Sequence, residues 1–172
     1  MTPRGRAPAV NATAAALLGL LHDGPMTGGQ LVAAAEGRFG AFFSVTRSQV
    51  YRELPVLAAG GLLKLGEQGP RASQQYVITP AGRRAFTGWL ASGAGADSLR
   101  SPLVLRLLHA GALTPDERAE IVRCNREAFG ARLASARSAA RAEGDPYRKA
   151  VADFAVAHNR AMVKLLDAIP LD

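Results

Sequence analysis

The residues best suited to binding chemistry form a short polar segment, residues 46–52, which reads Thr-Arg-Ser-Gln-Val-Tyr-Arg. Thr46 and Gln49 stand three residues apart, which is the spacing of an N-terminal capping box. A helix that begins here presents unpaired backbone amides and the positive end of its dipole, and Arg47 adds a full charge. Such groups bind phosphate oxygens. The segment therefore predicts a helix start that attracts anions.

The helix that positions this segment is predicted to have one apolar face, made by Val50, Leu54, Leu57 and Ala58. At about 100 degrees per residue, Ser48, Gln49 and Arg52 lie on the opposite face, with Tyr51 on the flank. Hydroxyl, amide and guanidinium groups hydrogen-bond to base edges in the major groove of DNA, and a tyrosine hydroxyl donates to phosphate. Pro55 is expected to kink the helix or to leave the Tyr51 carbonyl unpaired.

Each of these side chains also has a simpler interpretation. Arg47 and Arg52 are consistent with ordinary solvated charges, Gln49 with a cap, and Tyr51 with a half-buried core residue. The elements on either side favour the DNA interpretation, because they predict a scaffold that presents this helix.

Two helices are predicted before this one and a hairpin after it. Asn11 or Thr13 caps the first helix, and Thr27 opens the second with a capping box to Gln30; the second ends near Gly37. Strand-like runs at residues 62–65 and 74–78 flank an exposed turn, and Thr79-Pro80 opens a fourth helix. This order predicts a winged helix-turn-helix domain, mainly α with a small β-hairpin.

We expect a flexible N-terminus at residues 1–10 and the winged domain at residues 11–92. Phe39 to Phe43 are expected to plug the core between helices. The hairpin tip should bring Arg71 to the DNA backbone or minor groove, with Gln68 and Ser73 beside it. Thr27, at the start of the second helix, completes the predicted DNA-binding set.

The rest of the chain, residues 98–170, predicts an α-helical dimerisation region. Three helix starts are marked by a cap and a proline, at Ser101-Pro102, Thr114-Pro115 and Asp145-Pro146. The apolar positions predicted to dimerise recur every three or four residues: Leu103, Val104, Leu107, Leu108, Val151, Phe154, His158, Met162, Leu165 and Leu166. The alternative is that the tail folds back on the winged domain and leaves a monomer.

Charge favours a polyanionic partner. The formal net charge is +7, and residues 1–92 hold nine Lys or Arg against four Asp or Glu, whereas residues 93–172 hold twelve against ten. The positive field thus belongs mainly to the first half. An arginine-rich codon bias would give a similar total, so charge is supporting information only.

Other chemistries find little support in the sequence. The three histidines lie on separate predicted helices, and no nucleophile elbow, phosphate loop or dinucleotide fingerprint is present, so we expect no metal, no cofactor and no enzyme activity. Cys124, the single cysteine, is expected to be a small buried hydrophobe. The leucine-rich run at residues 17–21 is too short to span a bilayer, which predicts a soluble cytoplasmic protein with no membrane partner.

Three runs of sequence resemble the signature of the PadR family of bacterial transcriptional regulators. They are Ala16-Leu17-Leu18-Gly19-Leu20-Leu21, Gly24-Pro25-Met26-Thr27-Gly28, and Phe42 to Leu54 with Ser-Val-Thr-Arg-Ser-Gln-Val-Tyr-Arg-Glu inside it. Gly60-Gly61-Leu62-Leu63, Tyr76-Val77-Ile78-Thr79 and Ala81-Gly82-Arg83 match the wing and the following helix of that family. The helical tail resembles the longer-tailed branch loosely. Two departures are Gly29, where many members have tyrosine, and Pro55.

The resemblance implies a homodimeric repressor that binds double-stranded DNA at a pseudo-palindromic operator. It also implies that the fourth helix lies near a cleft where Phe86 and Trp89 are candidates to stack on a small apolar or aromatic effector. The alternative function is a winged-helix adaptor that binds protein without an operator. An enzyme is the weakest of the three, for want of paired catalytic residues.

Overall fold

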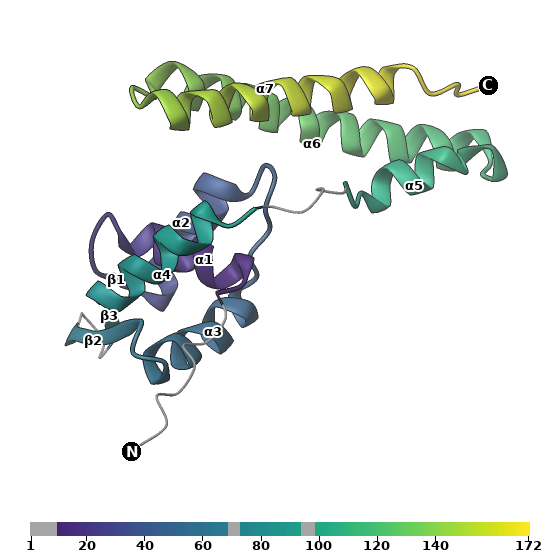
Figure 1. The fold of residues 1–172 in the computed structure, drawn as a ribbon. Coiled ribbons are helices and arrows are strands. Elements are labelled where there is room, and N and C mark those ends of the chain that lie inside the picture. Colours follow the sequence, from purple (N-terminus) through teal and green to yellow (C-terminus); the bar gives the residue numbers. More distant parts are fainter. Residues whose placement is uncertain (1–9, 69–72, 94–98) are drawn as a thin grey trace. The chain divides into compact units, whose positions relative to one another are not determined.

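The computed structural model describes residues 10–68, 73–93 and 99–172 (Figure 1). The chain divides into two compact units, residues 1–96 and residues 97–172. In chain order the elements are α1 (Ala12–Leu21), β1 (Met26–Thr27), α2 (Gly28–Phe39), α3 (Arg47–Ala59), β2 (Leu63–Gln68), β3 (Gln74–Ile78), α4 (Pro80–Ala91), α5 (Pro102–Leu108), the 3-10 helix η2 (Ala110–Ala112), α6 (Pro115–Ala142) and α7 (Pro146–Asp167).

Helix α1 forms the centre of the first unit. It is apolar on all sides, which is typical of a helix buried all round, and it contacts α2, α3, α4 and β3. Its four leucines, Leu17, Leu18, Leu20 and Leu21, are almost completely buried. Asn11 caps the helix by accepting a hydrogen bond from the Ala14 amide at 2.8 Å. This core is the support against which α3 packs.

The sheet has three antiparallel strands in the order β1-β3-β2. Strand β2 pairs Leu63 with Ile78 of β3, and an irregularity between Leu65 and Gln68 shifts the register toward the tip. The sequence did not predict β1, whose Met26 pairs with Tyr76. Because β1 runs directly into Thr27, the N-cap of α2, it attaches the start of α2 to the sheet.

The expected end of the second helix needs correction, whereas the third helix runs through Pro55, as its apolar face up to Ala58 predicts. Helix α2 continues past Gly37 to Phe39, and the Phe39 ring packs partly buried against the core, whereas Phe42 stays half exposed. Helix α3 continues through Pro55 to Ala59. Pro55 has no amide proton and lies on the exposed side, so water can satisfy the carbonyl of the preceding turn.

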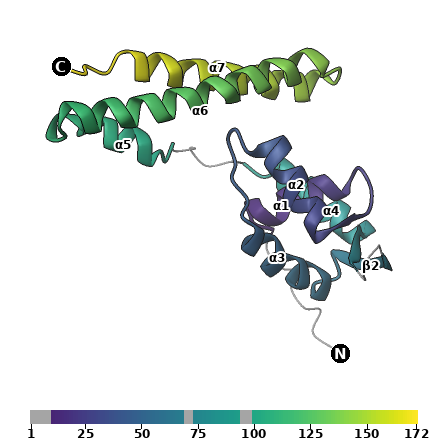
Figure 2. The same cartoon turned by 180° about the vertical axis from the view of Figure 1, so that it is seen from behind.

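The second unit is wholly helical, and α6 and α7 lie side by side as a helical hairpin (Figures 1 and 2). Leu107, Val122 and Leu166 form its small core. An ion pair joins Arg126 of α6 to Asp167 of α7. The Arg118 guanidinium donates to the carbonyls of Leu113 and Asp172, at 3.2 and 2.8 Å, which ties the C-terminal residue to the start of α6.

Candidate nucleic-acid interface

The N-terminus of α3 is built by a reciprocal cap. The backbone amide of Gln49 donates to Thr46 Oγ1 at 3.3 Å, and the backbone amide of Thr46 donates to Gln49 Oε1 at 2.8 Å. The Ser48 hydroxyl lies 3.1 Å from that of Thr46. Because Gln49 uses its carbonyl oxygen in the cap, only its side-chain NH2 group is left as a donor for another partner. The cap also fixes the direction in which the first turn faces.

The outward face of α3 is polar and accessible. The side chains of Arg47, Ser48 and Arg52 are exposed, and Gln49 is half buried. Within residues 10–68, 73–93 and 99–172, Arg52 makes no ion pair or hydrogen bond. The one acid nearby in sequence, Glu53, accepts a hydrogen bond of 2.9 Å from Asn11 Nδ2. A free guanidinium on this face is suited to a base edge or a phosphate.

Tyr51 connects α3 to the start of α2. The Arg47 guanidinium carbon lies 5.5 Å from the centre of the Tyr51 ring, which is a cation-π contact. The outer edge of the ring lies against Gly28, so that a Cβ built at Gly28 would be 2.8 Å from Tyr51 Cε1. Tyr51 itself is 46% exposed. The sequence does not predict this contact, because nothing local to either residue reveals it.

The wing is formed by β2 and β3. Gln68, at the end of β2, is exposed, and Ser73 before β3 is half buried. Gln74 Nε2 donates to the Gly66 carbonyl at 2.9 Å, which holds the two strands together at the irregular end. Arg71 lies outside the described residues, so its predicted DNA contact stays a prediction.

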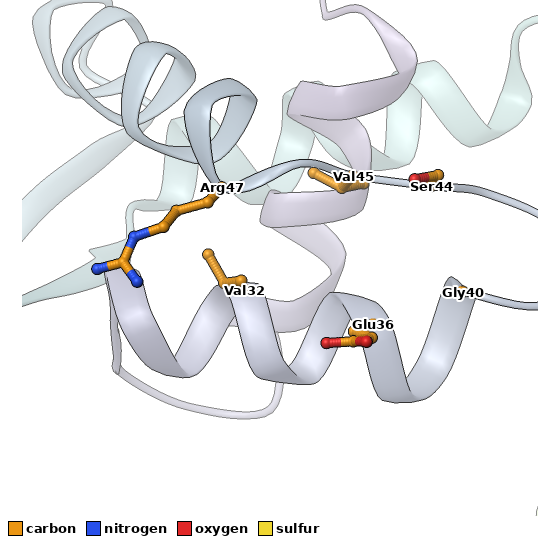
Figure 3. Close-up of a pocket in the computed structure, with 6 residues that line it drawn as sticks. All are labelled: Val32, Glu36, Gly40, Ser44, Val45 and Arg47. Atoms are coloured by element: carbon orange, nitrogen blue, oxygen red, sulfur yellow. The ribbon is translucent and has the colours of Figure 1, made fainter.

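A shallow cleft lies beside the start of α3, with a volume of about 320 Å³. Val32 and Glu36 of α2, Gly40, Ser44, Val45 and Arg47 line it (Figure 3). Figure 3 shows Arg47 extending from the start of α3 past Val32, while Glu36 lies one turn further along α2. Arg47 and Glu36 form no ion pair in the described part of the chain. Arg47 thus keeps its charge available on the exposed face of α3.

The two aromatic residues proposed to meet an effector have different environments. The Phe86 ring packs into the winged unit, with its centre 5.0 Å from the His22 ring and its edge against Gly19. Trp89 is 37% exposed. It lines a small cleft of about 180 Å³ together with Leu90, Ser92 and Gly93. Of the two, Trp89 is the one that lines this cleft.

Other reactive groups do not gather into a site. Among the described residues, no group of three or more His, Cys, Asp or Glu side chains is placed to hold a metal ion. No helix in that part of the chain is long and apolar enough to cross a membrane. Cys124 is exposed and not buried as expected. Its thiol donates to Glu120 at 3.1 Å, and this hydrogen bond raises the pKa of Cys124.

The comparisons with known proteins agree with this arrangement. Residues 17–88 match the model of the PadR-like family of transcriptional regulators. Within these residues the chain is PadR-like. The match includes the capped start of α3, both strands of the wing and most of α4. No protein of curated function matches the sequence.

Solved structures of PadR-like proteins share the fold of both units. A PadR-like regulator from Bacillus cereus has a TM-score of 0.77 at 22% identity, covering 90% of this chain and 93% of its own. PadR from Bacillus subtilis in complex with operator DNA has a TM-score of 0.72 at 22% identity, with 90% and 94% covered. The same protein in complex with p-coumaric acid has a TM-score of 0.66 at 21% identity, with 90% and 94% covered. At these identities the likeness establishes the fold: a PadR-like winged helix followed by C-terminal helices.

Proposed function

We propose that this PadR-like regulator is a homodimeric repressor that binds a pseudo-palindromic operator with α3 in the major groove. The observation that carries the proposal is the start of α3, where a closed capping box presents Arg47, Ser48 and Arg52 on an exposed face. Arg52 and Ser48 read base edges, together with the free amide group of Gln49. Arg47 and Tyr51 bind phosphate.

The neighbouring elements add contacts to the backbone of the duplex. Thr27, the N-cap of α2, contacts a backbone phosphate through its hydroxyl. Gln68, Arg71 and Ser73 belong to the wing, which reaches an adjacent backbone or minor groove. PadR from Bacillus subtilis, which shares this fold, has been solved with operator DNA. These contacts position the domain, while α3 supplies sequence preference.

The tail supplies the dimer. The tail leaves much apolar surface exposed for a single chain: Leu105 is 60%, Leu108 75%, Val151 44% and Phe154 54% exposed. A helical region that exposes so much apolar surface ordinarily covers it by packing against a second copy. Two α3 helices about one duplex turn apart, roughly 34 Å, then read a palindrome, and the linkage multiplies two weak half-site affinities.

The proposed dimerisation residues fall into two groups. Leu107, Met162 and Leu166 are buried within their own chain, and Leu103, Val104, His158 and Leu165 are half buried. These seven side chains pack within the second unit of their own chain. The exposed members, Leu108, Val151 and Phe154, are therefore the ones expected to meet the partner, and the Phe154 ring stacks on His158 with centres 6.2 Å apart.

We also propose that a small aromatic effector releases the operator by stacking on Trp89. Trp89 is the exposed aromatic of α4 and lines the cleft described above. PadR from Bacillus subtilis has been solved with p-coumaric acid, a planar aromatic acid. Since Trp89 is the single tryptophan of the chain, titration with p-coumaric acid followed by its fluorescence tests the site directly. Unchanged fluorescence at millimolar ligand would remove this effector class.

A mobility-shift assay tests the central proposal. The full-length chain is titrated against DNA from upstream of its own gene, with a shuffled fragment of equal length and composition as control. We expect a discrete complex with the upstream fragment at nanomolar protein and physiological salt. Equal, weak binding to both fragments would contradict operator recognition and favour the protein-binding adaptor.

A further inference from the structure

The Tyr51 ring packs so closely against Gly28 that it fills the space a side chain at residue 28 would need. Gly28 is buried at the first position of α2. The three atoms nearest to a Cβ built there all belong to Tyr51: Cε1 at 2.8 Å, Cζ at 3.0 Å and the hydroxyl oxygen at 3.1 Å. Any side chain at this position would therefore displace the ring.

The neighbouring glycine offers a direct contrast. Gly29 is exposed, and nothing lies within 4 Å of a Cβ built on it. Both glycines lie in the first turn of the same helix and after the same capping box. An alanine at either position changes helix propensity alike, but only the one at residue 28 meets Tyr51.

The Tyr51 ring that packs against Gly28 also contacts the Arg47 guanidinium. One helical turn separates Arg47 from Tyr51, and the guanidinium carbon lies 5.5 Å from the ring centre. A long arginine side chain loses conformational freedom when it binds. A ring that holds the guanidinium beforehand lowers this loss at the moment of DNA contact.

We propose that Gly28 is a positioning residue for DNA binding. Because Gly28 has no side chain, the Tyr51 ring can pack against α2, and the ring in this position holds the Arg47 guanidinium where it can bind a phosphate. The inference rests on the proposed DNA-binding function. It makes the packing of α2 against α3 part of the binding site, so that a buried glycine controls one of the phosphate contacts.

The test compares Gly28→Ala with Gly29→Ala in the full-length chain. Operator affinity is measured over a series of salt concentrations, and thermal unfolding is followed for each variant. Losing the hold on Arg47 should weaken binding by about two- to fivefold, the factor expected of one exposed cation-π contact. The slope of log affinity against log salt should shrink by up to about 0.9, the value for one phosphate. Gly29→Ala should match the wild type in both.

Removal of the ring provides the second measurement. In a Tyr51→Ser background the clash is absent, so Gly28→Ala should cause no further loss of affinity. Arg47→Ala and Tyr51→Ser should be less than additive when combined, because each ends the same contact. This pair keeps Gly28 intact and still decides the question if Gly28→Ala lowers the unfolding midpoint.

The outcomes separate the inference from the function beneath it. If the wild type binds its operator and Gly28→Ala equals Gly29→Ala in affinity and salt slope, the positioning role is wrong and the DNA-binding function stands. Strict additivity of Arg47→Ala and Tyr51→Ser also overturns it. If the wild type and Gly29→Ala bind no DNA, the proposed function itself fails.

Discussion

At the scale of single residues, some polar side chains at the start of α3 are already hydrogen-bonded within the protein, and others are left to bind a partner. Thr46 and the carbonyl oxygen of Gln49 are used by the capping box, and Glu53 is held by Asn11. Arg52 has no partner within the described residues. The expected base-reading role therefore falls most heavily on Arg52.

Replacing Arg52 by alanine should weaken operator binding by about 1–3 kcal/mol and relax the preference for one base pair, because a bidentate base contact is lost. Arg71→Ala should instead weaken all DNA sequences alike and reduce the salt slope. Binding curves with the operator and single-base variants distinguish the two effects. Arg137→Ala, an exposed arginine of α6, is the control. Wild-type affinity in both test variants, with unchanged folding, would show that the reading face is assigned wrongly.

At the scale of elements, the join between the wing and α4 is set by a close approach of two backbones. A Cβ built at Gly82 would lie 2.2 Å from the Leu62 carbonyl oxygen and 2.9 Å from Ile78 Cγ1. Thr79 spans the same join, with its hydroxyl donating to the Gly61 carbonyl at 2.7 Å. The orientation of the wing relative to α4 thus depends on one absent methyl group.

Gly82→Ala should lower the free energy of unfolding of the winged unit by about 1–3 kcal/mol, because the added carbon forces a backbone shift. Gly88→Ala on the same helix, where nothing lies within 4 Å, should be neutral or stabilising by up to about 1 kcal/mol. Urea denaturation followed by circular dichroism measures both. Equal stabilities would mean that the join relaxes without cost.

The start of α6 gives a prediction about pH. The Thr114 amide and hydroxyl both donate to Glu117, at 2.9 and 2.8 Å, and these hydrogen bonds lower the pKa of Glu117 from its ordinary value of 4.5. A carboxyl whose pKa is lower in the folded state stabilises the fold above its unfolded pKa, and this contribution disappears as the pH falls through the folded value. The stability difference between wild type and Glu117→Gln should therefore be largest near neutral pH, begin to fall as the pH approaches the unfolded pKa of about 4.3, and be lost once the pH lies below the folded pKa. Chemical denaturation at several pH values checks it, and a constant difference would contradict it.

The elements that the sequence predicted well are those with local causes. Caps at Thr27, Thr46 and Thr79 and the 3.6-residue periodicity gave the helices of the winged domain. Strand β1 has two residues and no periodicity, and it exists because β3 lies beside it. Cys124 was misplaced because residue type was weighed above helix position: it lies two residues, about 200 degrees, from the buried Val122. The Gly28–Tyr51 contact depends on how α2 and α3 cross, which one sequence does not give.

At the scale of the whole molecule, the chain combines two units with separate hydrophobic cores. Such units fold and act as modules when few contacts cross between them. The positive charge lies mainly on the first unit, and the large apolar side chains with the highest exposed fractions, Tyr147, Leu99 and Leu108, lie on the second. DNA binding and self-association are therefore expected to be separable by truncation.

Truncation after Ala91 should leave a winged domain that is folded, monomeric by light scattering, and unable to bind the operator tightly, since the second half-site contact is gone. The full-length chain should scatter as a dimer at the same concentration. Circular dichroism establishes that the fragment is folded. A fragment that remains dimeric would place the interface in the winged domain, and a monomeric full-length chain would favour a tail that folds back on the winged domain.

The burial of α1 also has a consequence for synthesis of the protein. Its leucines leave the ribosome before α4 does, and the ring that covers Gly19 belongs to Phe86 of α4, more than sixty residues later. At 5–20 residues per second, the helix waits roughly 3–13 s for this cover. During that interval its apolar surface is open to chaperones and to other nascent chains. Slow codons between α1 and α4 should therefore lower the soluble yield more than slow codons placed after α4, where the hairpin of α6 and α7 folds from neighbouring segments.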